Sequence, residues 1–181
     1  MNKKIVVLDR DGVINVDLMS YVTAPEDFKP IEGSLEAISK LNKSGYLVAI
    51  ATNQACINKG IISHKELLGI HNFMSKLLEQ YNGKIDYISY CPHDYSTEAC
   101  SCRKPETGLL KNIESHFDIS LKECFFVGDK ETDVQAAINH GCVPLLVETG
   151  YGSKAMKAKN RPPINNCFQD LAAAVDYIIS K

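Results

Sequence analysis

Two carboxylates one residue apart follow a short apolar run near the start of the 181-residue chain. Residues Ile5 to Leu8 are apolar, and Asp9, Asp11 and Gly12 come directly after them. Side chains two residues apart on an extended chain point the same way, so Asp9 and Asp11 can meet at one cation or reacting group. The same string also fits an ordinary turn after a strand, since aspartate and glycine are common turn residues.

Polar groups also follow two later apolar runs. Thr52 and Asn53 come after residues 46–51, and Asp129 comes shortly after residues 124–127. In sheets of parallel strands, ligands bind beyond the carboxyl ends of the strands. Together with the first pair of acids, Asp129 supplies the hard oxygen ligands that Mg²⁺ prefers, usually alongside phosphate oxygens. The sequence therefore predicts a magnesium site for a phosphorylated substrate.

Two further residues each have two interpretations. Asp133 stands in the first turn of a helix expected at residues 130–140, where an acid is favoured by the helix dipole or could orient water molecules on the metal. Lys104, between Arg103 and Pro105, could bring positive charge to phosphoryl oxygens. A lysine beside an arginine is also a common solvated surface pair.

Three cysteines and a histidine lie within twelve residues: Cys91, His93, Cys100 and Cys102. Three thiolates and one imidazole complete the tetrahedral ligand set of a structural zinc ion, with no position left for water. A short polar loop has little core of its own, so bound metal would order it. The other cysteines are expected to be small buried apolar residues or bystanders: Cys56, Cys124, Cys142 and Cys167.

Apolar runs and helical patterns alternate along the chain. Strands are expected at residues 5–9, 46–51, 85–90, 124–127 and 143–147. Helices are expected around residues 35–41, 63–81, 105–117, 130–140 and 171–180, with an exposed connection at 153–166. This alternation predicts parallel strands joined by right-handed crossovers. We expect one α/β domain over residues 1–181, a doubly wound five-stranded parallel sheet without a cap domain.

Composition limits the kinds of partner that the chain is expected to bind. The net charge is −2 and the lysines are scattered, which argues against nucleic acid. No apolar run is long enough to span a bilayer, and too few apolar residues follow Met1 to Lys4 for a signal peptide. Seven cysteines without an export signal favour reduced thiols over disulfides. We expect a cytoplasmic monomer that acts on a small molecule.

The motifs resemble those of the haloacid dehalogenase superfamily, in the same order and over most of the chain: Asp9-x-Asp11-Gly12-Val13, Thr52-Asn53, Lys104 and Gly128-Asp129. The resemblance implies a Mg²⁺-dependent phosphatase that acts through an aspartyl-phosphate. Asp9 would be the nucleophile, and Asp11 would protonate the leaving oxygen and later deprotonate water. The phosphoryl oxygens would be held by Thr52, Asn53 and Lys104. The implied Mg²⁺ ligands are Asp9, Asp129 and the backbone carbonyl of Asp11.

A Cys-x-His and Cys-x-Cys loop before Arg-Lys-Pro resembles capless members of this superfamily that act on heptose bisphosphates or on histidinol phosphate. The heptose type is nearer in these stretches: Asp9-Arg10-Asp11-Gly12-Val13-Ile14-Asn15-Val16-Asp17, Tyr21-Val22, Thr52-Asn53-Gln54, Gly60 and Gly128-Asp129-Lys130. Arg103 and Lys130 offer extra cations for a second phosphate, and the resemblance also places Asp17 and Tyr21 at the substrate. The expected reaction is removal of the 7-phosphate of a phosphorylated sugar, a manno-heptose 1,7-bisphosphate, on the way to lipopolysaccharide or surface glycans.

Two alternatives remain open at this point. The short zinc loop is closer to the histidinol-phosphate type, which acts in histidine biosynthesis. A different class of function is a zinc-ordered binding module on an inactive phosphatase scaffold. The presence of both Asp9 and Asp11 argues against the second alternative.

Overall fold

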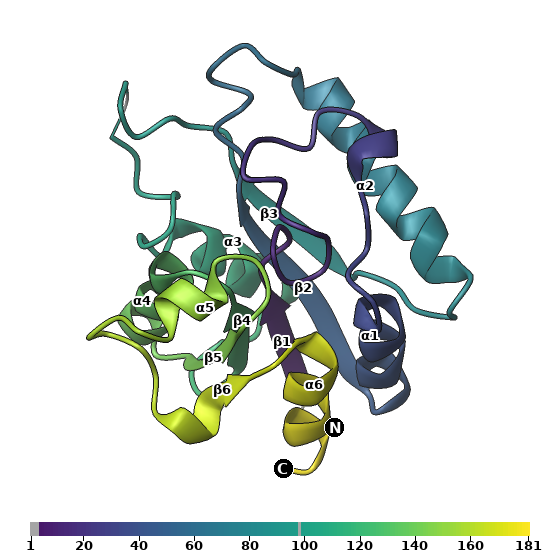
Figure 1. Cartoon of the computed structure of the whole chain (residues 1–181), viewed down its shortest axis with the longest axis vertical. Coiled ribbons are helices and arrows are strands. Elements are labelled where there is room, and N and C mark those ends of the chain that lie inside the picture. Colours follow the sequence, from purple (N-terminus) through teal and green to yellow (C-terminus); the bar gives the residue numbers. More distant parts are fainter. Residues whose placement is uncertain (1–3, 98) are drawn as a thin grey trace.

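The computed structural model describes residues 4–97 and 99–181. Residues 1–3, which belong to the stretch that argues against a signal peptide, and residue 98, inside the predicted zinc loop, lie outside the described residues. Six parallel strands form one sheet in the order β3-β2-β1-β4-β5-β6 (Figure 1). Their bounds are β1 Lys4–Leu8, β2 Tyr46–Asn53, β3 Tyr87–Cys91, β4 Phe125–Gly128, β5 Val143–Val147 and β6 Cys167–Phe168.

The predicted doubly wound parallel sheet is confirmed, but the prediction of five strands is wrong by one. The additional strand, β6, has two residues and pairs with the end of β5. A two-residue strand is too short to show any apolar periodicity, which is why the sequence pattern misses it.

Helices cover both faces of the sheet (Figure 1). Their bounds are α1 Ser34–Lys43, α2 His64–Glu79, α3 Gly108–Phe117, α4 Glu131–His140, α5 Gly152–Ala155 and α6 Leu171–Ile179, with 3-10 turns η1 Pro25–Asp27 and η2 Ile164–Asn166. Alternate residues of β1 face the two layers. Val6 and Leu8 pack in the core beneath α1, α2 and α6, whereas Ile5 and Val7 pack in the core beneath α3 and α4. Burial on both faces explains the uninterrupted apolar run.

The start of α2 follows the sequence signal. The hydroxyl of Ser63 accepts a hydrogen bond from the Glu66 N–H, and the Glu66 carboxylate accepts one from the Ser63 N–H. This reciprocal cap satisfies backbone donors that the first helical turn leaves unpaired.

Two segments differ from the prediction by more than a shift of one or two residues at an end. The helix expected from Pro105 begins at Gly108, because the Glu106 N–H donates to the Arg103 carbonyl in a turn that first brings Lys104 into the interior. The segment 153–166, expected to be an exposed connection, begins within α5, where Ala155 is buried.

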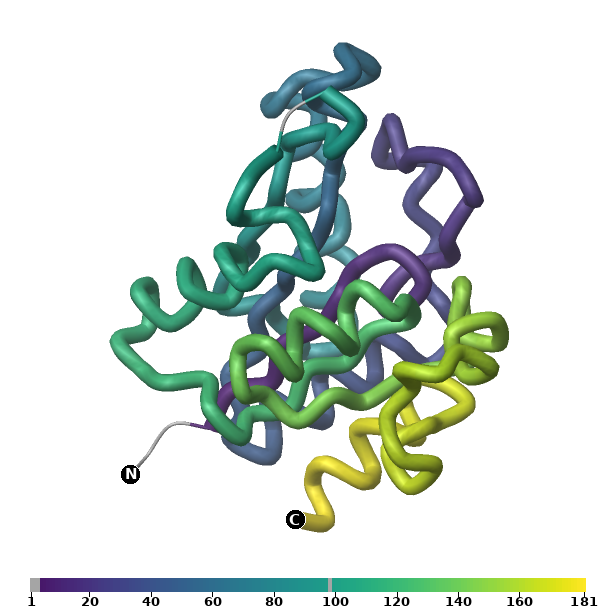
Figure 2. Tube along the Cα trace, turned by 90° about the vertical axis from the view of Figure 1, so that its left-hand side faces the viewer, coloured from purple at the N-terminus to yellow at the C-terminus, as the bar shows by residue number. Residues whose placement is uncertain are grey.

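All strands end at the same side of the sheet because they are parallel. The chain between β1 and α1 and the loop that follows β3 both extend from this end, and the C-terminus lies at the opposite end (Figure 2). In the described part of the chain, the residues between β1 and β3 outside the sheet contain only α1, α2 and η1, so no cap covers the strand ends. No helix among the described residues combines the length and apolar character needed to cross a bilayer.

Candidate active site and metal centre

Three buried carboxylates meet beyond the ends of β1 and β4. Asp9, Asp129 and Asp133 each offer an oxygen, and these oxygens lie within 4.8 Å of one another. Burial, followed by the neighbouring Asp133 and Asp9 charges, raises the pKa of Asp129 to about 8. Among the described residues, Asp129 Oδ1 has no hydrogen-bond partner. A divalent cation would offset this concentrated negative charge, so the donor set fits a hard cation such as Mg²⁺.

Asp133 fulfils the first of the two roles considered from the sequence, that of an acid at a helix start, whereas its role in orienting water molecules on the metal stays a prediction. Its Oδ2 accepts hydrogen bonds from the N–H groups of Asp129 at 3.2 Å and Lys130 at 2.9 Å, as expected for an acid at a helix start. Its Oδ1 lies 2.6 Å from Lys104 Nζ, within the acid cluster. One side chain therefore fixes the start of α4 and contributes charge to the site.

Lys104 lies at the centre of the site. Its side chain is 2% exposed, and Nζ lies 2.8 Å from Asp9 Oδ1 while donating to the Ala51 carbonyl at 2.7 Å. Burial lowers the pKa of this ammonium, but the charges of Asp133 and Asp9 outweigh burial and raise it overall. The interpretation of Lys104 as a solvated surface residue is wrong. A permanent positive charge beside Asp9 suits an incoming phosphoryl group.

The polar tip of β2 positions Lys104 and the pocket floor. Asn53 Oδ1 accepts from the Lys104 N–H at 3.0 Å, and Asn53 Nδ2 donates to the Lys104 carbonyl at 3.1 Å. The Thr52 hydroxyl oxygen accepts from Gln54 Nε2 at 2.9 Å, which leaves its own hydrogen to point elsewhere. The Asn53 amide is thus engaged by backbone, whereas the Thr52 hydroxyl can still donate a hydrogen bond, so its predicted contact with a phosphoryl oxygen stays a prediction.

The Asp11 carboxylate is not part of the acid cluster. It is held by Arg10, by Asn15 Nδ2 at 2.9 Å and by Gln54 Nε2 at 3.0 Å. Burial raises the pKa of Asp11, but Arg10 and these hydrogen bonds lower it by more. The expectation that Asp11 binds Mg²⁺ concerned its backbone carbonyl, and it stays a prediction.

A pocket of about 680 Å³ opens above these groups. Except for Asp129, which lies beneath it, every catalytic and substrate-binding residue predicted from the sequence lines this pocket: Asp9, Asp11, Asp17, Tyr21, Thr52, Asn53, Arg103, Lys104 and Lys130. The sequence prediction missed Gln54, Tyr95 and Tyr151, which also line the pocket. Nothing in the local sequence marks Tyr95 or Tyr151 as pocket residues, because each is brought there by a loop.

Two cations lie in the pocket wall. Lys130 Nζ is 2.9 Å from Asp17 Oδ2 and 4.9 Å from the centre of the Tyr151 ring. Burial lowers the pKa of Lys130, but the carboxylates of Asp9, Asp129 and Asp17 raise it overall. Arg103 Nη1 donates to the His93 carbonyl at 3.3 Å, which ties this guanidinium to the cysteine loop.

Two glycines allow the loop after β5 to close on Asp129. A Cβ at Gly12 or at Gly150 would lie 2.2 Å from Asp129 Oδ2, and both residues have positive φ, +88° and +60°. The Tyr151 N–H donates to the same Oδ2 at 2.8 Å. Asp129 Oδ2 is therefore fixed by backbone, whereas Oδ1 has, of the groups that the structure describes, only the Lys130 ammonium nearby, at 3.5 Å, and can also face a metal cation.

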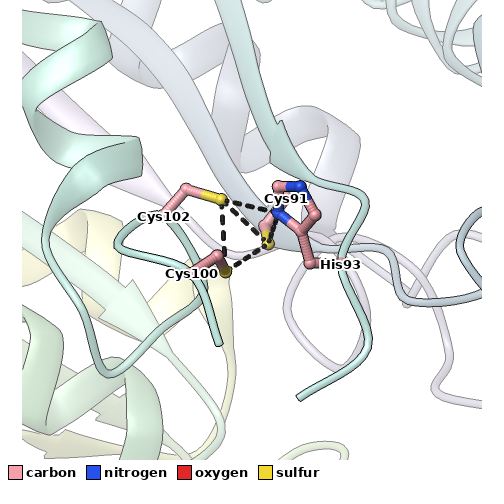
Figure 3. A group of neighbouring side chains, drawn as sticks. All are labelled: Cys91, His93, Cys100 and Cys102. Carbon is pink, nitrogen blue, oxygen red and sulfur yellow. Dashed lines mark hydrogen bonds between the residues drawn. The ribbon is translucent and has the colours of Figure 1, made fainter. Parts of the chain in front are cut away.

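The four predicted zinc ligands converge. Cys91 and His93 lie at the end of β3, and Cys100 and Cys102 face them from the returning chain (Figure 3). The separations are 3.1 Å between Cys91 Sγ and Cys102 Sγ, 3.6 Å between Cys91 Sγ and Cys100 Sγ, and 3.2 Å between His93 Nδ1 and Cys102 Sγ. A tetrahedral site with Zn–S bonds of about 2.3 Å has edges of about 3.8 Å, so slight expansion would admit zinc.

One of these thiols is already prepared for metal. Although burial raises the pKa of Cys100, the Arg103 N–H donates to its Sγ at 3.4 Å and helps lower the pKa to about 7. A thiolate is the form that binds metal, so the loop's own backbone favours binding.

Comparisons with known proteins agree with this geometry. The HAD-hydrolase-like family matches residues 101–174. The chain is 41% identical over 176 residues to D-glycero-beta-D-manno-heptose-1,7-bisphosphate 7-phosphatase of Pseudomonas putida, covering 97% of this chain and 99% of the relative. It is 36% identical to the Campylobacter jejuni D-glycero-alpha-D-manno-heptose-1,7-bisphosphate 7-phosphatase, covering 94% and 98%. The crystal structure of D,D-heptose 1,7-bisphosphate phosphatase from B. bronchiseptica, complexed with magnesium and phosphate, superimposes with a TM-score of 0.93 at 37% identity and 98% coverage of both chains.

Proposed function

Because this chain belongs to the haloacid dehalogenase superfamily, in the family of heptose 1,7-bisphosphate 7-phosphatases, we propose that it removes the 7-phosphate of a D-glycero-D-manno-heptose 1,7-bisphosphate. The chain is a phosphatase, so the alternative of a non-catalytic binding module is wrong. The observation that carries the proposal is the arrangement of Asp9 beside Lys104, at the floor of a pocket whose wall bears Arg103 and Lys130.

The reaction would proceed in two steps. An oxygen of Asp9 attacks phosphorus, the bond from phosphorus to the C7 oxygen breaks, and a proton from Asp11 passes to that oxygen. Water then attacks the phosphoaspartate and gives its proton to Asp11, which releases phosphate and restores both carboxyl groups. Lys104 and the Thr52 hydroxyl stabilise the charge on the transferring oxygens in both steps.

The cation would be held by Asp9, Asp129 and the backbone carbonyl of Asp11, with Asp133 beside them. When bound, Mg²⁺ supplies positive charge to the phosphoryl oxygens. The Oδ1 atom of Asp129, which in the described part of the chain has no hydrogen-bond partner and only a 3.5 Å ion-pair contact with Lys130 Nζ, and the buried charge of the cluster support this assignment.

The pocket wall favours a substrate with a second phosphate. Arg103 and Lys130 would contact the 1-phosphate while Lys104 serves the 7-phosphate, and Asp17 and Tyr21 would contact the sugar. Histidinol phosphate carries an ammonium group and would need free carboxylates at the same place. Asp17 is already paired with Lys130, which argues against that substrate.

The remaining parts of the proposal concern the setting of the enzyme. The four-residue Cys/His cluster would bind a structural Zn²⁺ that orders the loop carrying Arg103. The enzyme would work as a cytoplasmic monomer in the biosynthesis of nucleotide-activated heptose for lipopolysaccharide or other surface glycans.

Phosphate release from three substrates tests the proposed reaction: the α and β anomers of heptose 1,7-bisphosphate, and histidinol phosphate. We expect that one of the two anomers has the highest kcat/KM of the three substrates and that its hydrolysis depends on Mg²⁺. The Asp9→Asn variant should release no phosphate. Both anomers are needed because the relatives divide between them. A higher kcat/KM for histidinol phosphate than for either anomer would overturn the assignment.

A further inference from the structure

A buried histidine and a buried arginine remain unused by the mechanism above. Arg10 stands between the two catalytic aspartates and is fully buried, and His71 lies on α2 with only 5% of its surface exposed. Buried guanidinium and imidazole groups are costly unless they are paired, so their partners indicate what they do.

Arg10 forms several hydrogen bonds to the Asp11 carboxylate. Its Nε donates to Oδ1 at 3.1 Å, and its Nη2 lies 2.9 Å from both Oδ1 and Oδ2. This forked contact fixes the rotation of the carboxylate as well as its distance. Asp11 is the residue that must exchange a proton with the leaving oxygen and with water, so Arg10 determines how that carboxyl group is presented.

His71 contacts the Arg10 guanidinium through the nitrogen that does not face Asp11. Arg10 Nη1 lies 3.3 Å from His71 Nε2. Arginine has donors only, so His71 Nε2 must be the acceptor and the imidazole must be neutral with its proton on Nδ1. Burial, followed by the Arg10 charge, lowers the pKa of His71 to about 3, which agrees with a neutral ring.

Gln54 closes the arrangement on the side of the pocket. Its Oε1 accepts from Arg10 Nη2 at 3.3 Å, and its Nε2 donates to Asp11 Oδ2 at 3.0 Å and to the Thr52 hydroxyl at 2.9 Å. The amide can satisfy all of these contacts in one orientation only. Arg10, Gln54 and the Asp11 carboxylate therefore form one hydrogen-bonded unit, and His71 joins it through Arg10.

We propose that Arg10 and His71 are positioning residues that hold the Asp11 carboxyl group in the orientation needed for proton transfer. The inference rests on the proposed function, because it takes Asp11 as the acid and base. Through His71, helix α2 would determine the orientation of the Asp11 carboxyl group, although this helix contributes no residue to the floor of the pocket. His71 acts through Arg10 and does not touch the substrate.

The test exploits the leaving group. An alkyl phosphate has a poor leaving group that needs a proton, whereas 4-nitrophenyl phosphate releases a stable anion without one. A defect in Asp11 presentation therefore lowers kcat/KM for the alkyl substrate more than for the aryl one. The Asp11→Asn variant provides the reference pattern on this enzyme.

For His71→Leu we expect kcat/KM on the alkyl phosphate to fall about 10-fold to 100-fold, with a change below about 3-fold on the aryl phosphate. His71→Gln, whose amide oxygen can reach the place of Nε2, should recover most of the loss. His64→Leu is the matched control, because His64 also lies on α2 but is exposed and contacts the Tyr90 hydroxyl instead. If His71→Leu does not fold, His71→Asn replaces it, since the shorter amide leaves Arg10 Nη1 without its partner.

An equal loss on both substrates, or failure of His71→Gln to recover activity, would overturn the proposal and assign the pair to structural support of the pocket. The same holds for a His71 variant that behaves like His64→Leu. Failure of the proposed function has a different signature. In that case Asp11→Asn would lower kcat/KM equally for the alkyl and the aryl phosphate. The comparison can use any alkyl phosphate that the wild-type enzyme hydrolyses, histidinol phosphate included, so a wrong sugar assignment does not affect it.

Discussion

Replacing Lys104 by methionine should destabilise the metal-free protein strongly, and added Mg²⁺ should recover part of the loss. Lys104 Nζ lies 2.8 Å from Asp9 Oδ1 and 2.6 Å from Asp133 Oδ1 in a buried site. At an effective dielectric constant of about 20, each contact amounts to roughly 6 kcal/mol before the desolvation of the three groups is subtracted. Removing one partner of such a buried set costs about 3 to 5 kcal/mol, because the remaining charges stay buried.

The assay is urea denaturation in the presence of EDTA, with the free energy of unfolding extrapolated to water. Lys40→Met is the matched control, since Lys40 Nζ also lies 2.6 Å from a carboxylate, that of Asp176, but both side chains are more than half exposed. We expect less than about 1 kcal/mol for the control.

A second arm repeats the denaturation with Mg²⁺. The cation should stabilise Lys104→Met more than the wild type, because the variant site carries one positive charge fewer. A loss of stability equal to that of Lys40→Met would refute the argument that the lysine neutralises buried carboxylates. Equal stabilisation of both proteins by Mg²⁺ would show instead that the cation binds away from Lys104.

Four further outcomes are expected. The pKa of Asp129 is raised to about 8, so between pH 5 and pH 8 the native metal-free protein holds a proton that the unfolded chain has lost. Its free energy of unfolding should therefore decrease over this pH range in EDTA. An increase would contradict the inference that buried carboxylates raise the pKa of Asp129. Gly150→Ala should weaken Mg²⁺ activation at least 10-fold, because its Cβ would meet Asp129 Oδ2, whereas Gly60→Ala, with positive φ but open space, should cost only about 1 kcal/mol of stability. Cys100→Ser should lower bound zinc, measured by atomic emission, and raise KM; normal zinc content would remove Cys100 from the ligand set. Arg103→Ala should reduce kcat/KM more for heptose bisphosphate than for a monoester, and equal reductions would place Arg103 at the reacting phosphate.

The sequence was most informative where function depends on strand ends. A parallel sheet brings the tips of β1, β2 and β4 together whatever lies between them, so the sequence alone predicts that Asp9, Thr52 and Asp129 share one site. The cluster of Cys91, His93, Cys100 and Cys102 was equally predictable from the sequence, because these residues are close in sequence and chemically distinctive. Both predictions rest on short-range patterns and on one general rule of topology.

The parts that the sequence did not reveal depend on contacts between distant segments. Arg10 and His71 are 61 residues apart, and a lone histidine on a helix gives no sign that it supports an arginine. Lys104 had two interpretations because burial is decided by the turn around Pro105, which local propensity does not determine. The extra strand β6 and the short α5 are too brief to produce a periodic signal.

The paired hydrogen bonds between Asn53 and the Lys104 backbone have a consequence for how the loop after β3 can vary. The chain between His93 and Cys100 is fixed on one side by β3 and on the other by the cysteine pair and Asn53. Insertions or deletions there change only the span between two anchors, so the lysine keeps its place while the rim of the pocket is remodelled. Grafting loops of other lengths between these anchors is therefore a route to new substrate preferences without loss of the catalytic floor.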